Sequence, residues 1–462
     1  MSVLGAILVP HPPVILPQVG KGREHEIQAT VDAYRAAALR AAEWKPEVLV
    51  IISPHSVAYA DYFHLSPGSG AAGDMARFGA PQVRIEAQYD AKLVSEIMRL
   101  AQAAGIQAGT LGQRERELDH GTLVPLFFLR EAGVNCPLVR VGLSGLGPSA
   151  HYRLGKCIAQ AAGGLPRRTV VVASGDLSHK LKEDGPYGYA PQGPEFDRQA
   201  TRAMAEGDFL RFLTFDPAFC DAAAECGLRS FQIMAGALDG LAVTPELLSY
   251  QGNFGVGYGV AVFTPAGTDG NRHFDEAYES RERQRLEARR SAEDPWVRLA
   301  RLSLETYIRT GRRLGSLDEG LPPELTKRRA GTFVSLHRNG LLRGCIGTVA
   351  PATGSVAEEI LRNAVSAGTE DPRFSPVGPE ELDSLEYSVD VLEPAEAVSS
   401  PEELDVNRFG VIVTCGRRRG LLLPNLEGVD TVERQIAIAR QKGGIGPEEP
   451  YRLERFQVVR HT

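Results

Sequence analysis

Short and almost uninterrupted apolar runs are the feature of this chain that most limits its fold. Val48–Ser53 reads Val-Leu-Val-Ile-Ile-Ser, and Val3–Val9 and Thr169–Ser174 have the same character. Strands of this composition are typically covered on both faces, as in a parallel sheet between two layers of helices. Because longer helical patterns separate the runs, the first part of the chain is predicted to be an α/β domain with a largely parallel sheet flanked by helices. The other elements predicted here are a strand at Leu138–Gly142, helices at 24–43, 91–104 and 150–161, and a last strand within 255–263.

The length of the chain indicates two domains, because 462 residues exceed the length that usually folds around one hydrophobic core. The first domain is predicted over residues 1–265. Residues 266–293 are polar, with a charge run at 281–285, and are predicted to form a charged linker or an exposed helix. The second domain then covers residues 294–462, where helical and strand patterns mix as in α+β folds.

Composition excludes several classes of protein. The chain is 43% hydrophobic and 24% charged, with a formal net charge of −7, so it lacks the basic surplus of a general nucleic-acid binder. Its first apolar run stops at Pro10, which is too short for a signal peptide or a membrane span. Six scattered cysteines without a Cys-x-x-Cys pair do not form a disulfide scaffold. We therefore expect a cytoplasmic protein without membrane contact.

Three histidines share one position relative to the predicted strands. His11 follows the strand Val3–Val9, His55 follows Val48–Ser53, and His179 follows Thr169–Ser174. Ligands of open α/β sheets bind outside the carboxyl ends of the strands, so three strands are predicted to aim imidazoles at one edge. A fourth histidine, His120, precedes a helical pattern. A single histidine is most often structural, but this shared placement favours a functional site.

Two imidazoles and one carboxylate form the facial triad of non-haem Fe(II) sites, and the third ligand should come from later in the chain. Glu225 is the preferred candidate, because it stands beside a small, apolar stretch where a buried carboxylate needs a partner. Cys226 is the alternative, since a thiolate also binds metals, preferably softer ones. Adjacent side chains of an extended segment point to opposite faces, so only one of the two would face the ion. Fe(II) is the expected cofactor, with another divalent transition metal as the alternative.

At this point the first domain resembles the class III extradiol dioxygenases, in particular the LigB-like family among them. Five motifs occur in that family's order and span nearly the whole domain: Val9-Pro10-His11-Pro12-Pro13, Ser53-Pro54-His55, Asp119-His120-Gly121, 174–179 and the segment around Glu225. The resemblance implies that His11, His55 and Glu225 hold iron. It also implies that His179 is the acid/base histidine and that His120 is a second active-site histidine.

The resemblance implies an oxygenase that acts with O₂ on a catechol-like aromatic substrate. In that reaction His179 would take a substrate proton and later return one, a task for a group that titrates near neutral pH. The related Memo proteins resemble such oxygenases but have a cysteine ligand in a Cys-Gly-Arg context. Residues 226–229, Cys-Gly-Leu-Arg, resemble that motif imperfectly. Because the related dioxygenases are generally multimeric, a homo-oligomer is also expected.

The second domain resembles the AMMECR-type domain over about residues 290–462. Its first motif is Leu342-Arg343-Gly344-Cys345-Ile346-Gly347, and further matches lie at 371–374, 387–392 and 420–424. The fusion of both domains resembles bacterial proteins of the AmmeMemoRadiSam system, whose third component is a radical-SAM enzyme. This implies an alternative function, in which the chain is the metal-binding component of a modification pathway and has a radical-SAM enzyme as partner.

One cysteine of the second domain is a candidate nucleophile. A hairpin is predicted for 332–346, with Asn339-Gly340 as its turn. Arg343 and Cys345 are two positions apart on its second strand and therefore share one face of the sheet. A guanidinium group near the thiol would stabilise a thiolate. The alternative is a packed cysteine beside a structural arginine.

Overall fold

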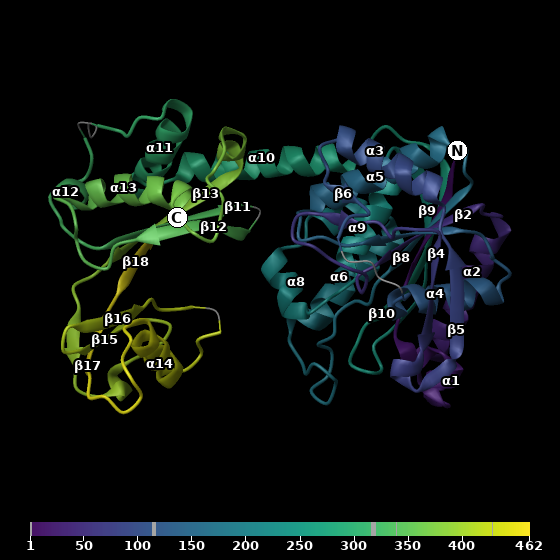
Figure 1. The fold of residues 1–462 in the computed structure, drawn as a ribbon, viewed down its shortest axis with the longest axis horizontal. Coiled ribbons are helices and arrows are strands. Elements are labelled where there is room, and N and C mark those ends of the chain that lie inside the picture. Colours follow the sequence, from purple (N-terminus) through teal and green to yellow (C-terminus); the bar gives the residue numbers. More distant parts are fainter. Residues whose placement is uncertain (1, 113–116, 316–319, 339, 427) are drawn as a thin grey trace. The chain divides into compact units, whose positions relative to one another are not determined.

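The computed structural model describes the whole chain except residues 1, 113–116, 316–319, 339 and 427 (Figure 1). It divides into two compact units, Met1–Arg281 and Glu282–Thr462. The division falls inside the helix α10 (Phe274–Ala292), which occupies the segment predicted as a charged linker or an exposed helix. Its only buried residue is Asp275, as expected for a solvated helix.

The first unit is built on a six-stranded sheet in the order β7-β2-β8-β1-β10-β9. The first four of these strands are parallel to one another, whereas β10 and β9 are antiparallel to their neighbours. The strands are β1 (Val3–Val9), β2 (Val48–Ser53), β7 (Leu138–Gly142), β8 (Thr169–Ser174), β9 (Leu241–Gln251) and β10 (Tyr258–Thr268). The predicted α/β fold with a largely parallel sheet is confirmed, and the four parallel strands have the predicted bounds.

Helices cover both faces of this sheet (Figure 1). In β1, Ile7 and Val9 belong to one hydrophobic cluster, while Ala6 and Leu8 belong to the other. The first cluster lies under α2 (Gln28–Glu43) and α4 (His120–Glu131), and the second under α3 (Ala91–Ala103), α5 (Pro148–Gly164) and α9 (Leu228–Ala237). This two-sided burial is the physical reason for the apolar runs in the sequence. The other elements of this unit are α1 (Pro17–Gly20), α6 (Gln192–Glu206), α7 (Phe209–Leu213), α8 (Pro217–Ala223), β3 (Phe63–His64), β4 (Gly70–Met75), β5 (Ala80–Gln88), β6 (Ala108–Gly109) and the 3₁₀ turns η1 (Pro13–Ile15), η2 (Arg23–Ile27) and η3 (Ala76–Phe78).

Two glycines set the distance between α5 and α9. A Cβ atom on Gly236 would lie 1.8 Å from the carbonyl oxygen of Tyr152, and one on Gly155 would lie 2.0 Å from the carbonyl oxygen of Ile233. The two helices therefore touch backbone to backbone, which only glycine allows. Since α9 begins two residues after Cys226, this contact also fixes the end of the loop that carries Cys226.

The second unit is α+β, as predicted. Its two antiparallel sheets have the strand orders β12-β11-β13-β18 and β14-β17-β15-β16. The predicted hairpin is formed by β11 (Thr332–Arg338) and β12 (Leu341–Gly347), although Asn339 itself lies outside the described residues. The remaining elements are α11 (Pro295–Thr310), α12 (Pro323–Thr326), α13 (Val356–Thr369), α14 (Val432–Lys442), β13 (Leu385–Leu392), β14 (Glu396–Val398), β15 (Gly410–Cys415), β16 (Arg418–Leu422), β17 (Arg452–Phe456), β18 (Val458–His461), η4 (Pro379–Ser384) and η5 (Pro401–Glu403).

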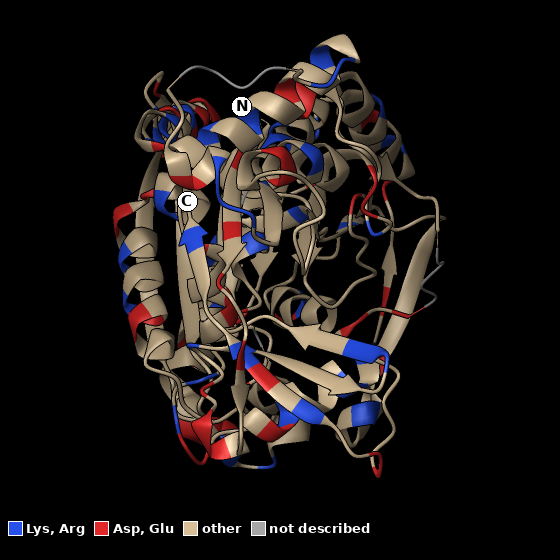
Figure 2. Ribbon diagram, turned by 90° about the vertical axis from the view of Figure 1, so that its left-hand side faces the viewer, with Lys and Arg blue, Asp and Glu red and all other residues tan. Residues whose placement is uncertain are grey.

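The distribution of charged, apolar and cysteine residues in the folded chain can be compared with the expectations from composition. Acidic and basic residues are interspersed along the ribbon (Figure 2). Within the described part of the chain, no helix has the length and apolar character needed to cross a membrane. All six cysteines are free thiols.

Candidate metal centre

Three side chains from distant parts of the chain meet at the carboxyl edge of the parallel strands. His11 comes two residues after β1, His55 two residues after β2, and Cys226 from the loop before α9. One ligand atom from each lies within 4.8 Å of the other two. The Nε2 atoms of His11 and His55 are 2.9 Å apart, and Sγ of Cys226 is 3.7 Å from Nε2 of His11.

These spacings fit one transition-metal ion. Two imidazole nitrogens, each about 2.1 Å from one ion, are about 3.0 Å apart at the right angle of octahedral geometry and about 3.4 Å apart at a tetrahedral angle. A thiolate about 2.3 Å from the same ion, at a tetrahedral angle, lies about 3.6 Å from a ligating nitrogen. Imidazole and thiolate donors suit zinc, copper or iron rather than magnesium or calcium. The geometry therefore supports a metal site, and its donor set points to a transition metal.

Of the two adjacent candidates for the third ligand, Cys226 and not Glu225 belongs to the group of described side chains that could hold a metal ion with His11 and His55. The helix α8 ends at Ala223, and the next residue, Ala224, has a left-handed φ of 52° that turns the chain. The carboxylate of Glu225 instead accepts a hydrogen bond of 2.7 Å from the backbone amide of Leu228 in the first turn of α9. This bond satisfies a free amide of the helix start, so the buried carboxylate has a partner without a metal.

The electrostatics of the site favour neutral histidines. Burial lowers the pKa of His11 well below its usual value and also lowers that of His55. Both imidazoles are therefore unprotonated at neutral pH, as metal binding requires. Burial raises the pKa of the Cys226 thiol, and the charges of Asp176 and Glu225 raise it further. A bound cation would stabilise the thiolate against these effects.

His11 has hydrogen-bond partners at the end of β8 and in the loop that follows it. Its Nδ1 lies 3.0 Å from Oγ of Ser174, at the end of β8, and its backbone amide donates to Oδ1 of Asp176 at 2.8 Å. Such partners fix the orientation of a ligating imidazole. Burial raises the pKa of Asp176 to about 6.

The two further histidines both interact with candidate ligands, His120 through ring contacts and His179 through a charge effect that lowers the pKa of His11. His120 begins α4 and stacks on His55, with ring centroids 4.1 Å apart. Burial lowers the pKa of His120 to about 3, with smaller contributions from His55 and His11. His179 uses Nδ1 for a bond of 2.6 Å to the carbonyl oxygen of Ala224, which leaves Nε2 as the nitrogen with the lone pair. The structure thus brings His11, His55 and His120 into ring contact with one another, and the roles of all four histidines stay predictions.

A buried ionic network supports this edge. Asp119 caps α4 by accepting the amide of Thr122, and its Oδ1 also accepts the Ser53 hydroxyl at 2.5 Å. Its Oδ2 lies 3.4 Å from Nη1 of Arg140, a fully buried residue of β7. Because Ser53 also accepts the amide of His55, the network ties the start of α4 to the turn that holds a candidate ligand.

Two aromatic residues at the site escaped the sequence analysis. Phe78, in η3, meets the ring of His120 edge-on at 5.4 Å, and Tyr187 meets the ring of His179 edge-on at 5.1 Å. Their side chains are 39% and 61% exposed. No motif or periodicity marks either residue, because Phe78 lies in a short 3₁₀ turn and Tyr187 lies in a loop.

In the second unit, Arg343 is engaged by a carboxylate. Its Nε and Nη2 donate to Glu381 at 2.9 Å each. The thiol of Cys345 lies 3.2 Å from Oγ of Ser335, and its backbone amide donates to Asp371 at 2.9 Å. These contacts describe a hydrogen-bonded strand cysteine, and a nucleophilic role for Cys345 stays a prediction.

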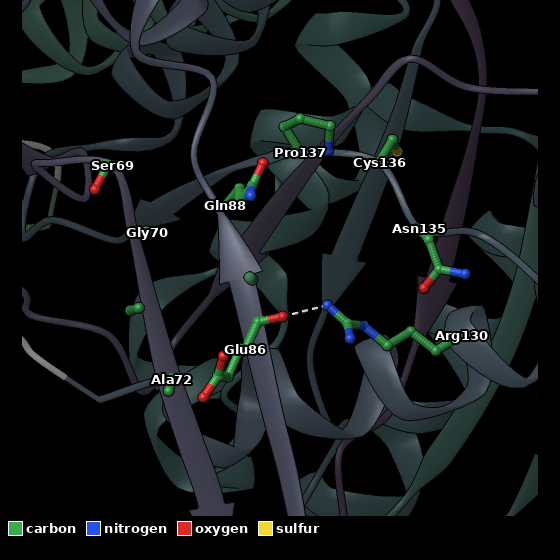
Figure 3. Close-up of a pocket in the computed structure, with 11 residues that line it drawn as sticks. Ser69, Gly70, Ala72, Glu86, Gln88, Arg130, Asn135, Cys136 and Pro137 are labelled. Atoms are coloured by element: carbon green, nitrogen blue, oxygen red, sulfur yellow. Dashed lines mark hydrogen bonds between the residues drawn. The ribbon is translucent and has the colours of Figure 1, made fainter.

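A separate pocket of about 560 Å³ lies at the start of β7, away from the carboxyl edge (Figure 3). Arg130, in the last turn of α4, donates there to the carbonyl oxygen of Glu86. Asn135, Cys136 and Gln88 also line it. None of the candidate ligands is among its lining residues, so it is distinct from the metal centre.

Two protein families match two successive parts of the chain. The family described as the catalytic LigB subunit of aromatic ring-opening dioxygenase matches residues 5–261, and the AMMECR1 family matches residues 297–461. Protein CA_C1420 of Clostridium acetobutylicum is 40% identical over 468 residues, which cover 100% of this chain and 99% of that protein. A protein of Thermotoga maritima is 51% identical over 172 residues, covering 37% of this chain and 98% of its own length. The crystal structure of the uncharacterised protein PH0010 of Pyrococcus horikoshii has 34% sequence identity and a TM-score of 0.33, covering 36% of this chain and 88% of that one.

The match to the LigB family spans more than half of the chain, and the relative from Clostridium acetobutylicum is similar from end to end. The two families meet in one polypeptide, in the order expected from the sequence motifs. This chain belongs to the LigB family, described as the catalytic LigB subunit of aromatic ring-opening dioxygenase, and has an AMMECR1 domain joined to its LigB domain.

Proposed function

We propose that the LigB domain is a metal-dependent oxygenase that opens a catechol-like aromatic ring with O₂ and uses Fe(II). The observation that carries this proposal is the convergence of His11, His55 and Cys226 on one point, with His179 beside them and its Nε2 available. A metal with three protein ligands keeps positions open for substrate and O₂.

The chain's own residues have distinct tasks in this proposal. A ferrous ion, when bound, would supply the redox-active centre at which a catecholate and O₂ come together. His179 would accept a proton from a substrate hydroxyl at Nε2 and later return it. His120, which burial keeps neutral, would exchange hydrogen bonds with substrate oxygens. The exposed rings of Phe78 and Tyr187 would contact the flat faces or edges of the substrate ring.

The reaction balances without an added reductant. Ring opening of a catechol breaks one carbon–carbon bond, and both atoms of O₂ enter the product. One O₂ is therefore consumed for each ring opened.

We propose a second candidate because Cys226, a thiol, lies with His11 and His55 in the candidate site. A thiolate at this place would stand where the Fe(II) facial triad has a carboxylate, and thiolates favour softer ions. In this second proposal the chain is a metal-binding component of a modification pathway, works with a radical-SAM enzyme, and has no ring-opening activity.

Oxygen uptake separates the two candidates. The full-length protein is loaded with Fe(II) without oxygen and then mixed with catechol or 3,4-dihydroxybenzoate in an oxygen electrode, while ring opening is followed by absorbance. The first candidate predicts equal consumption of O₂ and diol, and none with the His11→Ala/His55→Ala variant. If the iron-loaded protein holds its metal but consumes no O₂ with either diol, ring opening of these substrates is rejected and the second candidate is favoured.

A further inference from the structure

The loop after β8, residues 175–181, carries His179 and is held by residues outside the metal centre. On one side, the amide of Gly257 donates to the carbonyl oxygen of Ser178 at 2.8 Å. On the other side, the amide of Ser178 donates to Oδ1 of Asp197 at 2.8 Å. A carboxylate on α6 therefore fixes the peptide unit of the residue directly before the proposed acid/base histidine.

Asp197 is an unusual group for this position. Its side chain is buried, and only 1% of the residue is exposed. Its second oxygen, Oδ2, accepts the hydroxyl of Tyr250, from β9, at 2.7 Å. Burial raises the pKa of Asp197 to about 7, whereas the bonds from Ser178 and Tyr250 lower it. Because a buried carboxylate is costly unless its hydrogen bonds are made, both donors hold it in one place.

The packing around Asp197 is equally tight. A Cβ atom on Gly257 would lie 2.0 Å from Oδ2 of Asp197. Glycine at this position lets the strand end approach the carboxylate, and any side chain would displace it. The helix α6, the strand β9 and Gly257, the residue before β10, thus meet at one carboxylate that bonds to the loop of His179.

The ring of His179 depends on this arrangement. Its Nδ1 donates to the carbonyl oxygen of Ala224 at 2.6 Å, and the backbone amide of His179 donates to Ala223 at 3.2 Å. A shift of the Ser178 peptide would lengthen both bonds, and the short ring bond selects the tautomer with hydrogen on Nδ1.

We propose that Asp197, held by Tyr250, is a positioning residue that fixes the direction and tautomer of the His179 ring through the amide of Ser178. Its importance for turnover rests on the proposed function, in which Nε2 of His179 moves a proton. The positioning itself does not require that any substrate be turned over, so it can be tested alone.

The test is nitrogen NMR of the full-length, metal-free protein labelled with ¹⁵N-histidine. The His179 signals are assigned by their loss in His179→Gln. The wild-type protein should show one His179 tautomer, with hydrogen on Nδ1. Asp197→Ala should replace it by signals averaged between the two tautomers, while Asp197→Asn, which can still accept the Ser178 amide, should restore the wild-type pattern.

The matched control is Asp90→Ala. Asp90 also accepts backbone amides, those of Lys92 and Leu93, but at the start of α3. An unchanged His179 signal in Asp197→Ala would overturn the proposal, and so would an equal change in Asp90→Ala. If Asp197→Ala does not fold, Tyr250→Phe decides, since Tyr250 is 41% exposed on an edge strand. Partial averaging in Tyr250→Phe supports the proposal, and an unchanged signal overturns it.

The same variants distinguish this proposal from the proposed function. Suppose that the His179 signals of Asp197→Ala are averaged between tautomers while the wild-type protein consumes no O₂ with catechols. The positioning role of Asp197 is then supported and ring opening is rejected. If the wild-type protein opens catechol rings and Asp197→Ala leaves the His179 tautomer unchanged, ring opening is supported and the positioning role of Asp197 is rejected.

Discussion

The Nε2 atoms of His11 and His55 lie 2.9 Å apart, although the residues are 44 positions apart in the chain. Their strands, β1 and β2, are not neighbours, because β8 lies between them. The two side chains therefore meet across the carboxyl end of β8, which supplies Ser174 as a partner for His11. Ligands at this edge are expected for a parallel sheet, and their close approach has measurable consequences.

Removing both histidines should abolish metal binding. Two of three candidate ligands are lost in His11→Ala/His55→Ala, and one thiolate cannot hold a transition metal against solvent and buffer. Metal analysis after anaerobic Fe(II) loading should give about one ion per chain for the wild type, as one three-ligand site requires, and none for the variant. Equal metal content in both proteins would show that the ion binds elsewhere.

The two adjacent candidates for the third ligand should behave differently. Cys226→Ala should weaken metal binding by more than the roughly 10–100-fold that follows the loss of an outer partner. Glu225→Gln should bind metal like the wild type, because a glutamine oxygen can still accept the amide of Leu228. Competition with a chromophoric chelator measures both affinities. The opposite order would return the ligand role to Glu225.

Loss of His179 should separate binding from turnover. Its ring bonds to Ala224 rather than to the candidate ligands, so His179→Ala should retain the metal. Any oxygen-dependent turnover should fall by about 10²–10⁴-fold, the usual contribution of a general acid–base group. Metal content and oxygen uptake are measured on the same sample. A variant that loses its metal would instead identify His179 as a ligand.

The contact between α5 and α9 should not tolerate a methyl group. Gly236→Ala places a Cβ atom 1.8 Å from the carbonyl oxygen of Tyr152, and the shift needed to relieve this should lower the free energy of unfolding by about 1–3 kcal/mol. Gly163→Ala, near the end of α5, is the control, since the nearest atom to its Cβ would be 3.9 Å away. Urea unfolding followed by circular dichroism should show a lower midpoint for the first variant alone.

Asp197 should make stability depend on pH. Burial raises its pKa in the folded protein to about 7, so the folded state keeps a proton that the unfolded state releases near pH 4. Stability from this group is complete below about pH 4 and is lost as pH rises to about 7, because the folded state binds more protons in that window. Asp197→Asn lacks this loss. Its free energy of unfolding, compared with that of the wild type, should therefore rise by roughly 2–3 kcal/mol as the pH goes from 5 to 7. If the two proteins differ in free energy of unfolding by the same amount at pH 5 and at pH 7, as measured by urea unfolding, the prediction is contradicted.

Much of the first domain could be predicted from local sequence. The apolar runs that became β1, β2, β7 and β8 were recognisable because each strand is buried on both faces, so most positions are apolar, with Arg140 of β7 as a charged exception. Placing His11, His55 and His179 at one edge required only the rule that parallel strands end together. The strand β9 escaped notice because its residues are only partly buried, so its pattern is mixed.

The choice between Glu225 and Cys226 was decided by tertiary structure. Both residues follow one apolar stretch, and nothing in their order shows which side chain faces the histidines. The left-handed turn at Ala224 and the free amide at the start of α9 direct Glu225 to the helix and Cys226 to His11. Phe78 and Asp197 reach the site only through contacts between segments far apart in the chain. By itself the sequence determined the strands and the edge where they end, since these depend on local burial, while the packing of distant loops decided which atoms meet there.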